Sequence, residues 1–161
     1  MIQLKPFEAD DWIYLSAWIS NERELIQFAG KIFTFPLDKN QIVVYLSDPL
    51  RTVFKIADEN ELIIGMAEIS IEQDNTAKLA RILIGEKSMR GKGIGAALMR
   101  ILIDYAFNTL KKEQIILNVY SWNTAAIKCY ENAGFVRTSK PIKYVMVGDE
   151  EWESMEMKLH L

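Results

Sequence analysis

The sequence predicts an α/β fold, of the α+β kind, in which one mixed sheet carries the helices. Residues 79–84 are nearly all apolar, as in a strand buried on both faces, and a glycine-rich turn and a helical pattern follow them. A second short apolar run, residues 115–119, comes after that helix, so the three elements predict a right-handed βαβ unit with two parallel strands. Alternating patterns on either side predict antiparallel hairpins, which makes the sheet mixed.

Length and composition limit the possible classes. At 161 residues the chain is expected to form a single domain, residues 1–161. A net charge of −3 offers no basic surface for nucleic acid, and no apolar run approaches the roughly 18 residues that span a membrane. Cys129 is the only cysteine, so no intramolecular disulfide can form and a cytoplasmic location is expected. No metal site is expected.

The first half of the chain predicts two helices around a less regular stretch. A short strand at residues 2–4 precedes an amphipathic helix at residues 8–20, with acidic residues in its first turn. Residues 22–35 contain a glycine and are expected to be the end of a helix pair and a loop. A short helix at residues 37–47 is expected to begin near Pro36.

The middle of the chain predicts a hairpin and the parallel unit. Residues 52–57 and 62–71 flank a polar turn and form the hairpin. A third strand runs from about residue 77 to residue 84 and is interrupted by Arg81. Residues 94–110 place their apolar side chains at a period of about 3.6, which predicts the crossover helix.

The last third predicts one helix and an edge hairpin. The helix begins near Asn123 or Thr124, either of which can cap it, and ends at Gly134. Residues 141–147 and 155–161 alternate between apolar and polar side chains and predict antiparallel strands. His160, the only histidine, falls on the polar face of the last strand and is expected to lie at the surface.

The turn at residues 90–95 has the composition of an anion-binding loop. It reads Arg-Gly-Lys-Gly-Ile-Gly and opens a helix, whose first N–H groups have no partner within the helix and carry a partial positive charge. The spacing of its glycines does not match a P-loop, and G-x-G-x-G is not the dinucleotide fingerprint G-x-G-x-x-G. A nucleotide-phosphate enzyme is therefore disfavoured.

Two segments together resemble one family. Arg90, Gly93 and Gly95 match Arg/Gln-x-x-Gly-x-Gly/Ala, the coenzyme A pyrophosphate loop of the GNAT superfamily of N-acetyltransferases. Residues 118–135 are similar to the second GNAT signature, in which an asparagine opens a helix, Ala-Ile-x-x-Tyr follows, and Gly-Phe closes the unit. Asn123 and Tyr130 are seven residues apart, which puts them about 20° from one another around the helix, on one face.

The resemblance implies a GNAT fold and acetyl-CoA as cosubstrate. That fold has a mostly antiparallel sheet of six to seven strands, a central parallel pair that splays at its C-terminal end, and about four helices. The loop would hold the pyrophosphate, main-chain groups of the preceding strand would pair with the pantetheine arm, and Asn123 would cap its helix or help to hold that arm. The cofactor-binding residues expected in this way are Ile82, Leu83, Ile84, Arg90, Gly91, Lys92, Gly93, Ile94, Gly95 and Asn123.

The same resemblance implies direct attack of a primary amine of a small molecule, peptide or protein on the thioester. Tyr130 would return a proton to the departing thiolate, which is uphill by roughly 2 kcal/mol for unperturbed groups. Many relatives carry a glutamate on the strand before the loop, but this strand offers only Arg81. Glu68, with Glu72 next, is the expected substitute as general base, directly or through water.

The acceptor is not identified by the sequence. Residues 22–35 and the tail hairpin are expected to select it, and the N-terminal half is similar to the branch that contains ribosomal-protein N-terminal acetyltransferases. The alternative is a non-catalytic acyl-CoA sensor on the same fold, which the absent glutamate makes worth testing. The chain is expected to act as a monomer or homodimer.

Overall fold

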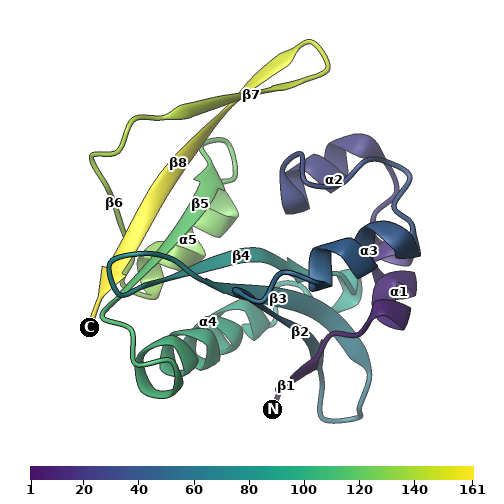
Figure 1. Ribbon diagram of the computed structural model, residues 1–161, viewed down its shortest axis with the longest axis horizontal. Coiled ribbons are helices and arrows are strands. Elements are labelled where there is room, and N and C mark those ends of the chain that lie inside the picture. The colour runs from purple at the N-terminus through teal and green to yellow at the C-terminus, as the bar shows by residue number, and fades with distance from the viewer. The chain divides into compact units, whose positions relative to one another are not determined.

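The computed structural model describes all 161 residues and contains eight strands and five α-helices (Figure 1). The α/β prediction is confirmed: the sheet is mostly antiparallel, and strands β4 (Thr76–Ile84) and β5 (Gln114–Tyr120) form its one parallel pair. One more strand and one more helix are present than the sequence suggested. No helix is both long enough and apolar enough to cross a membrane.

The chain divides into two compact units, which are described separately. The first comprises Met1–Ser70 and Ala80–Ile94, and the second comprises Ile71–Leu79 and Gly95–Leu161. Strand β4 therefore contributes residues to both units. That residues 1–161 act as a single acetyltransferase domain stays a prediction.

The strands of the first unit follow the sequence pattern closely. Strand β1 (Gln3–Pro6) pairs antiparallel with β2 (Arg51–Ala57), and β2 pairs antiparallel with β3 (Ile63–Ile71). The turn between β2 and β3 is closed by Asp58, whose carboxylate accepts hydrogen bonds from the N–H groups of Asn60 and Leu62 at 2.8 and 2.9 Å. The predicted hairpin is thus confirmed.

The helices of the first unit correct one prediction. A short 3₁₀ turn η1 (Ala9–Asp11) leads into α1 (Trp12–Trp18), and α3 spans Lys39–Leu46, both close to the expected places. The stretch expected to be irregular forms the regular helix α2 (Glu22–Ala29). Asn21 caps it by accepting a hydrogen bond from the N–H of Glu24, and Gly30 ends it at φ 63°.

The core of the first unit joins these helices to the strands. Leu15, Leu25 and Ile42 of the three helices are at most 1% exposed, and they belong to one buried cluster with Val53 of β2 and Met66 of β3. The apolar faces of α1, α2 and α3 are therefore buried against one another and against the hairpin (Figure 1).

The second unit contains the parallel pair. Residues Thr76–Leu79 of β4 lie in register with Gln114–Leu117 of β5, joined by α4 (Ile94–Asp104) and a π-helical turn η3 (Tyr105–Thr109). The βαβ unit is thus confirmed, although the π-helical turn was not expected. Pairing is observed over these four positions, and splaying of the strands beyond them stays a prediction.

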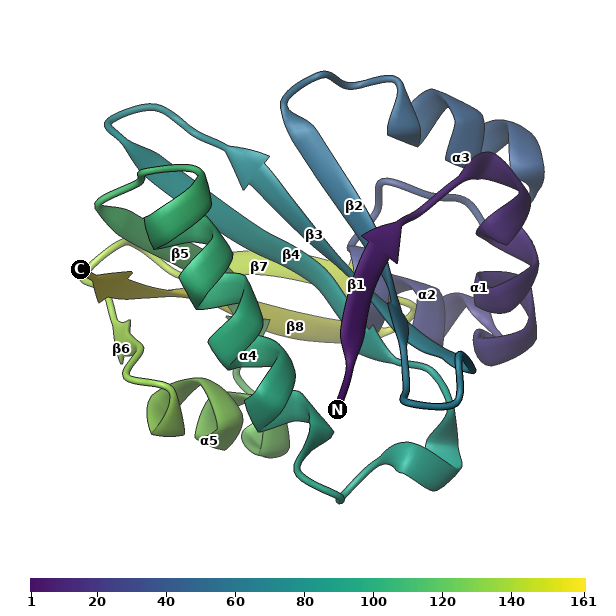
Figure 2. The ribbon, with the colours of Figure 1, turned by 90° about the horizontal axis from the view of Figure 1, so that it is seen from below.

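The remaining strands extend the second unit in the order β4-β5-β8-β6, with β7 paired to β8. Helix α5 (Thr124–Asn132) leads into β6 (Val136–Arg137), a two-residue strand that the sequence did not predict. Strands β7 (Lys143–Val147) and β8 (Glu150–His160) form the expected hairpin, which extends past the end of β5 (Figure 1). Helices α4 and α5 cover the face of β5 that carries its buried residues (Figure 2).

Candidate active site

The glycine-rich loop opens α4 as predicted, with its backbone open. Gly91 and Gly93 have φ values of 74° and 77°, and no atom lies within 4 Å of where a Cβ would stand at either position. These left-handed conformations favour glycine, and they leave bare main chain at the surface. Lys92 and Arg90 are exposed, and Arg90 Nε donates a hydrogen bond of 2.8 Å to the carbonyl oxygen of Ile84.

The end of β4 before the loop is fixed by two close contacts. A Cβ on Gly65 of β3 would lie 2.2 Å from the carbonyl oxygen of Leu83, so only glycine allows this approach. A Cβ on Gly85 would lie 2.0 Å from the indole ring of Trp18, which packs on the bare backbone there. The Gly85 N–H donates to the carbonyl oxygen of Ile64 at 2.8 Å. The strand end carrying the predicted pantetheine residues is thus held in place by β3 and α1.

Helix α5 presents both residues expected from the second signature. Asn123 is the N-cap, and its side-chain oxygen accepts a hydrogen bond of 3.3 Å from the N–H of Ala126. The cap uses only this oxygen, so the two N–H donors of the amide are left for a ligand. Tyr130 lies seven residues further along the helix and is half-buried, with its ring centroid 6.3 Å from that of Phe135.

One contact brings the end of the loop to this helix. A Cβ on Gly95 would lie 3.5 Å from Cys129 Sγ, so the first turn of α4 packs directly on α5 beside Tyr130. Burial raises the pKa of the Cys129 thiol, which keeps it protonated and unsuited to act as a nucleophile. The structure therefore places the last loop residue next to the helix that carries Asn123 and Tyr130.

The environment of Tyr130 moves its pKa upward. Burial, and then the neighbouring Cys129, raise the pKa of the phenol to about 12. Proton donation to a thiolate of ordinary pKa about 8.5 is then uphill by about 5 kcal/mol, rather than the roughly 2 kcal/mol for an unperturbed tyrosine. The side chain stays in its proton-donating form at all neutral pH values.

Glu68, the expected general base, lies on β3 with only 2% of its surface exposed. Arg81 Nη1 donates hydrogen bonds to both carboxylate oxygens, at 3.0 and 3.1 Å. Tyr45 Oη donates to Oε1, and Arg51 Nε lies 3.6 Å from the same oxygen. To accept a proton from an amine, this carboxylate must first release one of these partners.

Glu68, Tyr45 and Arg51 together fix the position of the Arg81 side chain, and these four residues form one cluster. The φ of Arg81, 48°, places this residue in the left-handed region, which costs a non-glycine residue about 1–2 kcal/mol. Its guanidinium lies 5.6 Å from the centroid of the Tyr45 ring, and that of Arg51 lies 4.6 Å from the same centroid. Burial, and then the Glu68 carboxylate, raise the pKa of Tyr45, so its hydroxyl remains a donor. Four side chains thus fix the β4 backbone one residue before Ile82.

The sequence did not predict two of the four side chains of this cluster. Tyr45 lies on α3 and Arg51 is the first residue of β2. Neither belongs to a motif, and their role becomes visible only when β2 and β3 are paired. Two signals in the sequence point to this cluster: Arg81 interrupts an apolar strand, and Glu68 is the expected base. Glu72, the expected second choice for the base, is exposed, follows the last residue of β3 and is not part of this cluster.

Comparison with known proteins gives partial matches to several acetyltransferases. N-acetylaspartate synthetase from Danio rerio is 32% identical over 112 residues, which is 69% of this chain and 39% of that protein. Aminoglycoside N(6')-acetyltransferase type 1 from Klebsiella pneumoniae is 40% identical over 55 residues, 34% of this chain and 27% of that protein. The chain thus spans well under half of the length of these curated relatives.

The fold itself is shared over nearly the whole chain. The crystal structure of spermidine N-acetyltransferase from Vibrio cholerae, in complex with CoA and spermine, superposes with a TM-score of 0.83 and covers 99% of this chain and 95% of its own. At 21% sequence identity this similarity concerns the fold. The family model for the acetyltransferase (GNAT) family matches residues 13–135, which include the loop, the strand before it and α5. The chain therefore belongs to the acetyltransferase (GNAT) family.

Proposed function

We propose that the protein transfers an acetyl group from acetyl-CoA to a primary amine by direct attack of the amine on the thioester. The observation that carries this proposal is the open glycine loop at the start of α4, packed through Gly95 on the helix that bears Asn123 and Tyr130. Membership of the GNAT family and the acetyltransferase relatives support it.

The residues present fit acetyl-CoA. Bare backbone at Gly91 and Gly93, the free N–H groups expected at the start of α4, and the exposed cations of Arg90 and Lys92 suit a pyrophosphate. Residues Ile82–Ile84 are half-buried at a strand end fixed by Gly65 and Trp18, which suits main-chain pairing with an extended arm. Arg90 must exchange its bond to the Ile84 carbonyl for the ligand if both groups are used. When bound, acetyl-CoA supplies the activated acyl group.

Tyr130 is proposed as the general acid. An uphill proton transfer of about 5 kcal/mol is compatible with turnover, because a kcat of about 10 s⁻¹ corresponds to a total barrier of about 16 kcal/mol. The raised pKa also ensures that the hydroxyl carries its proton when the thiolate departs. A thiolate close to the hydroxyl would be stabilised by its hydrogen bond before the proton moves.

For Glu68 we propose a positioning role in place of the base role expected from the sequence. Its carboxylate has partners on both oxygens, and Arg81, which contacts both of them, lies next to the predicted pantetheine segment. By fixing Arg81 in its left-handed conformation, Glu68 would aim the main-chain groups of the following residues at the donor. The incoming amine would then lose its proton to water or to a group of the acceptor site.

Coenzyme A release over a panel of amines tests the function. Release with at least one acceptor supports acetyl transfer, and thermal stabilisation by acetyl-CoA but not by ATP or NAD confirms the donor. Stabilisation without release from any polyamine, aminoglycoside, amino acid or peptide would favour the acyl-CoA sensor, for which the engaged state of Glu68 is the supporting observation. Absence of both effects would refute the proposal.

Three further features remain proposals. The similarity to ribosomal-protein N-terminal acetyltransferases concerns the N-terminal half, and none of the relatives named above is such an enzyme. A monomer or homodimer and a cytoplasmic location are proposed from the sequence alone, and size-exclusion chromatography with light scattering tests the first of these.

A further inference from the structure

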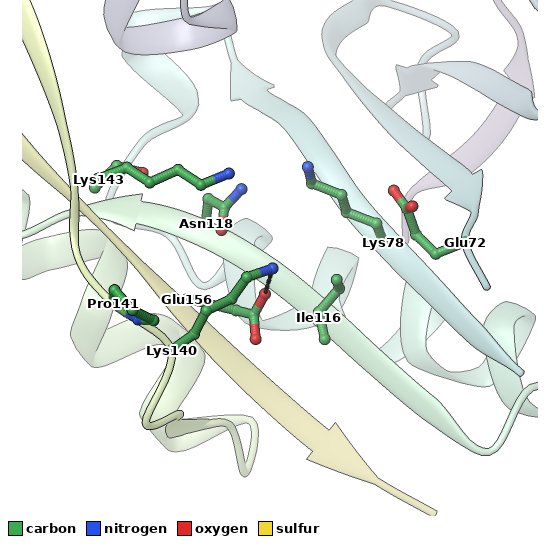
Figure 3. Close-up of a pocket in the computed structure, with 9 residues that line it drawn as sticks. Glu72, Lys78, Ile116, Asn118, Lys140, Pro141, Lys143 and Glu156 are labelled. Atoms are coloured by element: carbon green, nitrogen blue, oxygen red, sulfur yellow. Dashed lines mark hydrogen bonds and ion pairs between the residues drawn. The ribbon is translucent and has the colours of Figure 1, made fainter. Parts of the chain in front are cut away.

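A polar pocket lies on the face of the second unit opposite α4 and α5 (Figure 3). Because side chains alternate along a strand, Ile115 and Leu117 point into the core while Ile116 and Asn118 point to this other face. The pocket has a volume of about 100 Å³, which suits a small organic group rather than a coenzyme. Its lining comes from β4, β5, β7 and β8, from the turn after β3 and from the segment before β7: Glu72, Lys78, Ile116, Asn118, Lys140, Pro141, Lys143, Ser154 and Glu156.

The strand registers bring these distant residues together. Lys78 of β4 pairs with Ile116 of β5, Asn118 pairs with Glu156 of β8, and Ser154 of β8 pairs with Lys143 of β7. Four neighbouring strands thus each place a polar side chain on one face. The pocket is therefore part of the sheet architecture rather than a gap between loops.

The charges of the pocket are unequal. Lys140 forms an ion pair of 3.2 Å with Glu156, which neutralises both. Lys78 and Lys143 make no ion pair or hydrogen bond through their ammonium groups, and Glu72, beyond Lys78, is the one carboxylate left. The remaining charges are two positive and one negative, so the pocket keeps a net positive charge.

The polar groups also converge. Figure 3 shows the ammonium groups of Lys78 and Lys143 reaching toward one another from opposite sides, with the amide of Asn118 between them. The side chain of Asn118 is exposed and has no protein partner. The two ammonium groups and an amide N–H can donate hydrogen bonds to the oxygens of a carboxylate, and the apolar side chain of Ile116 can contact the carbon chain that bears it. A polycation would be repelled at this place.

We infer that this pocket binds the carboxylate of the amine acceptor, so that the acceptor carries a carboxylate as well as its amine, as an amino acid does. The inference rests on the proposed function. Lys78, Lys143 and Asn118 hold the carboxylate and determine specificity, while the acetyl group is transferred elsewhere on the bound molecule.

Matched acceptor pairs test this specificity. Lysine and cadaverine, or tyrosine and tyramine, differ only in the carboxylate, and we expect kcat/KM to favour the carboxylate member by at least about tenfold. K78Q and K143Q should each reduce this preference by about tenfold, mostly through KM. K111Q removes an exposed lysine of the second unit that does not line the pocket, and the preference should stay as in the unchanged protein.

A binding measurement separates the two proposals. Calorimetric titration with glutarate, which has carboxylates but no amine, should show binding that K143Q weakens about tenfold and K111Q does not change. Equal or better rates with cadaverine and tyramine, or a preference that neither K78Q nor K143Q alters, would overturn the carboxylate site while leaving acetyl transfer intact. If no acceptor releases coenzyme A, the proposed function fails, and the glutarate titration still decides whether the pocket binds a carboxylate.

Discussion

Replacing Glu68 by glutamine separates a positioning role from a base role. The substitution keeps the size of the side chain but removes the charge that Arg81 and Arg51 face at 3.0–3.6 Å. Loss of one partner from a buried pair costs about 3–5 kcal/mol, and we expect about 3 kcal/mol because each arginine side chain is nearly one-fifth exposed. For a chain of this length, about 3 kcal/mol lowers the Tm by about 6–12 °C.

Thermal unfolding measured by circular dichroism checks the stability. Glu151→Gln is the matched control, because Glu151 is an exposed strand glutamate and its loss should change the free energy of unfolding by no more than about 0.5 kcal/mol. A Tm for Glu68→Gln within about 2 °C of the unchanged protein would refute the assignment of this cluster as a structural anchor of β4.

Kinetics with Arg81→Gln complete the test. If Glu68 positions the strand through Arg81, both single variants lose rate in similar measure, and the double variant is little worse than either, because both remove one interaction. If Glu68 is instead the base, Arg81→Gln frees the carboxylate and retains activity, while Glu68→Gln loses about 10²–10⁴ in kcat. The second pattern would refute the positioning role.

Three further variants test the donor side of the site. Tyr130→Phe should lower kcat with little change in the KM for acetyl-CoA. Folding raises the pKa of the Tyr130 phenol from 10 to about 12, so the phenol contributes about 3 kcal/mol of stability below pH 10, and this contribution is lost as the pH rises to about 12. Unfolding curves of the variant should not show this alkaline loss of stability. Gly93→Ala should lower stability, because of the positive φ, and should raise the KM for acetyl-CoA about tenfold. Gly30→Ala, at a similar φ of 63° away from the loop, should lower stability by a similar amount without changing that KM. Asn123→Ala should cost about 1 kcal/mol of stability by loss of the helix cap, whereas Asn123→Ser can still cap and should keep the stability of the unchanged protein. If the amide N–H groups of Asn123 bind the pantetheine arm, the serine variant should bind acetyl-CoA more weakly. Equal affinity for acetyl-CoA in the serine variant and the unchanged protein would contradict that role.

The parts of the fold with a strong local pattern were predictable. The hairpin of β2 and β3, the crossover helix and the N-cap at Asn123 follow from periodicity, turn residues and cap preference, which all act over a few residues. Helix α2 was not predicted as a separate helix, because Gly30 makes residues 22–35 less regular as a helical pattern. The signal was present, since Asn21 followed by Glu24 is a capping pattern, and Glu24 indeed accepts from the Ser20 N–H.

Other features depend on contacts between distant residues. The two-residue strand β6 is too short for any period, and it exists because β8 offers partners at Lys158 and Met157. The ion pairs of Glu68 join residues from β2, β3 and β4, so no local window contains them. The same holds for the polar pocket of the second unit, whose lining residues come together only when four strands are in register.

Because Gly95 packs on Cys129, the reactivity of this thiol can be used to measure binding of acetyl-CoA. The only thiol of the chain lies 3.5 Å from where a Cβ would stand on the last loop residue, and its raised pKa makes alkylation slow and dependent on alkaline pH. A maleimide or iodoacetamide footprint is therefore a single-site measurement that needs no engineered label. Its rate reads out how often α4 and α5 separate, and protection by acetyl-CoA would register occupancy in solution without any acceptor present.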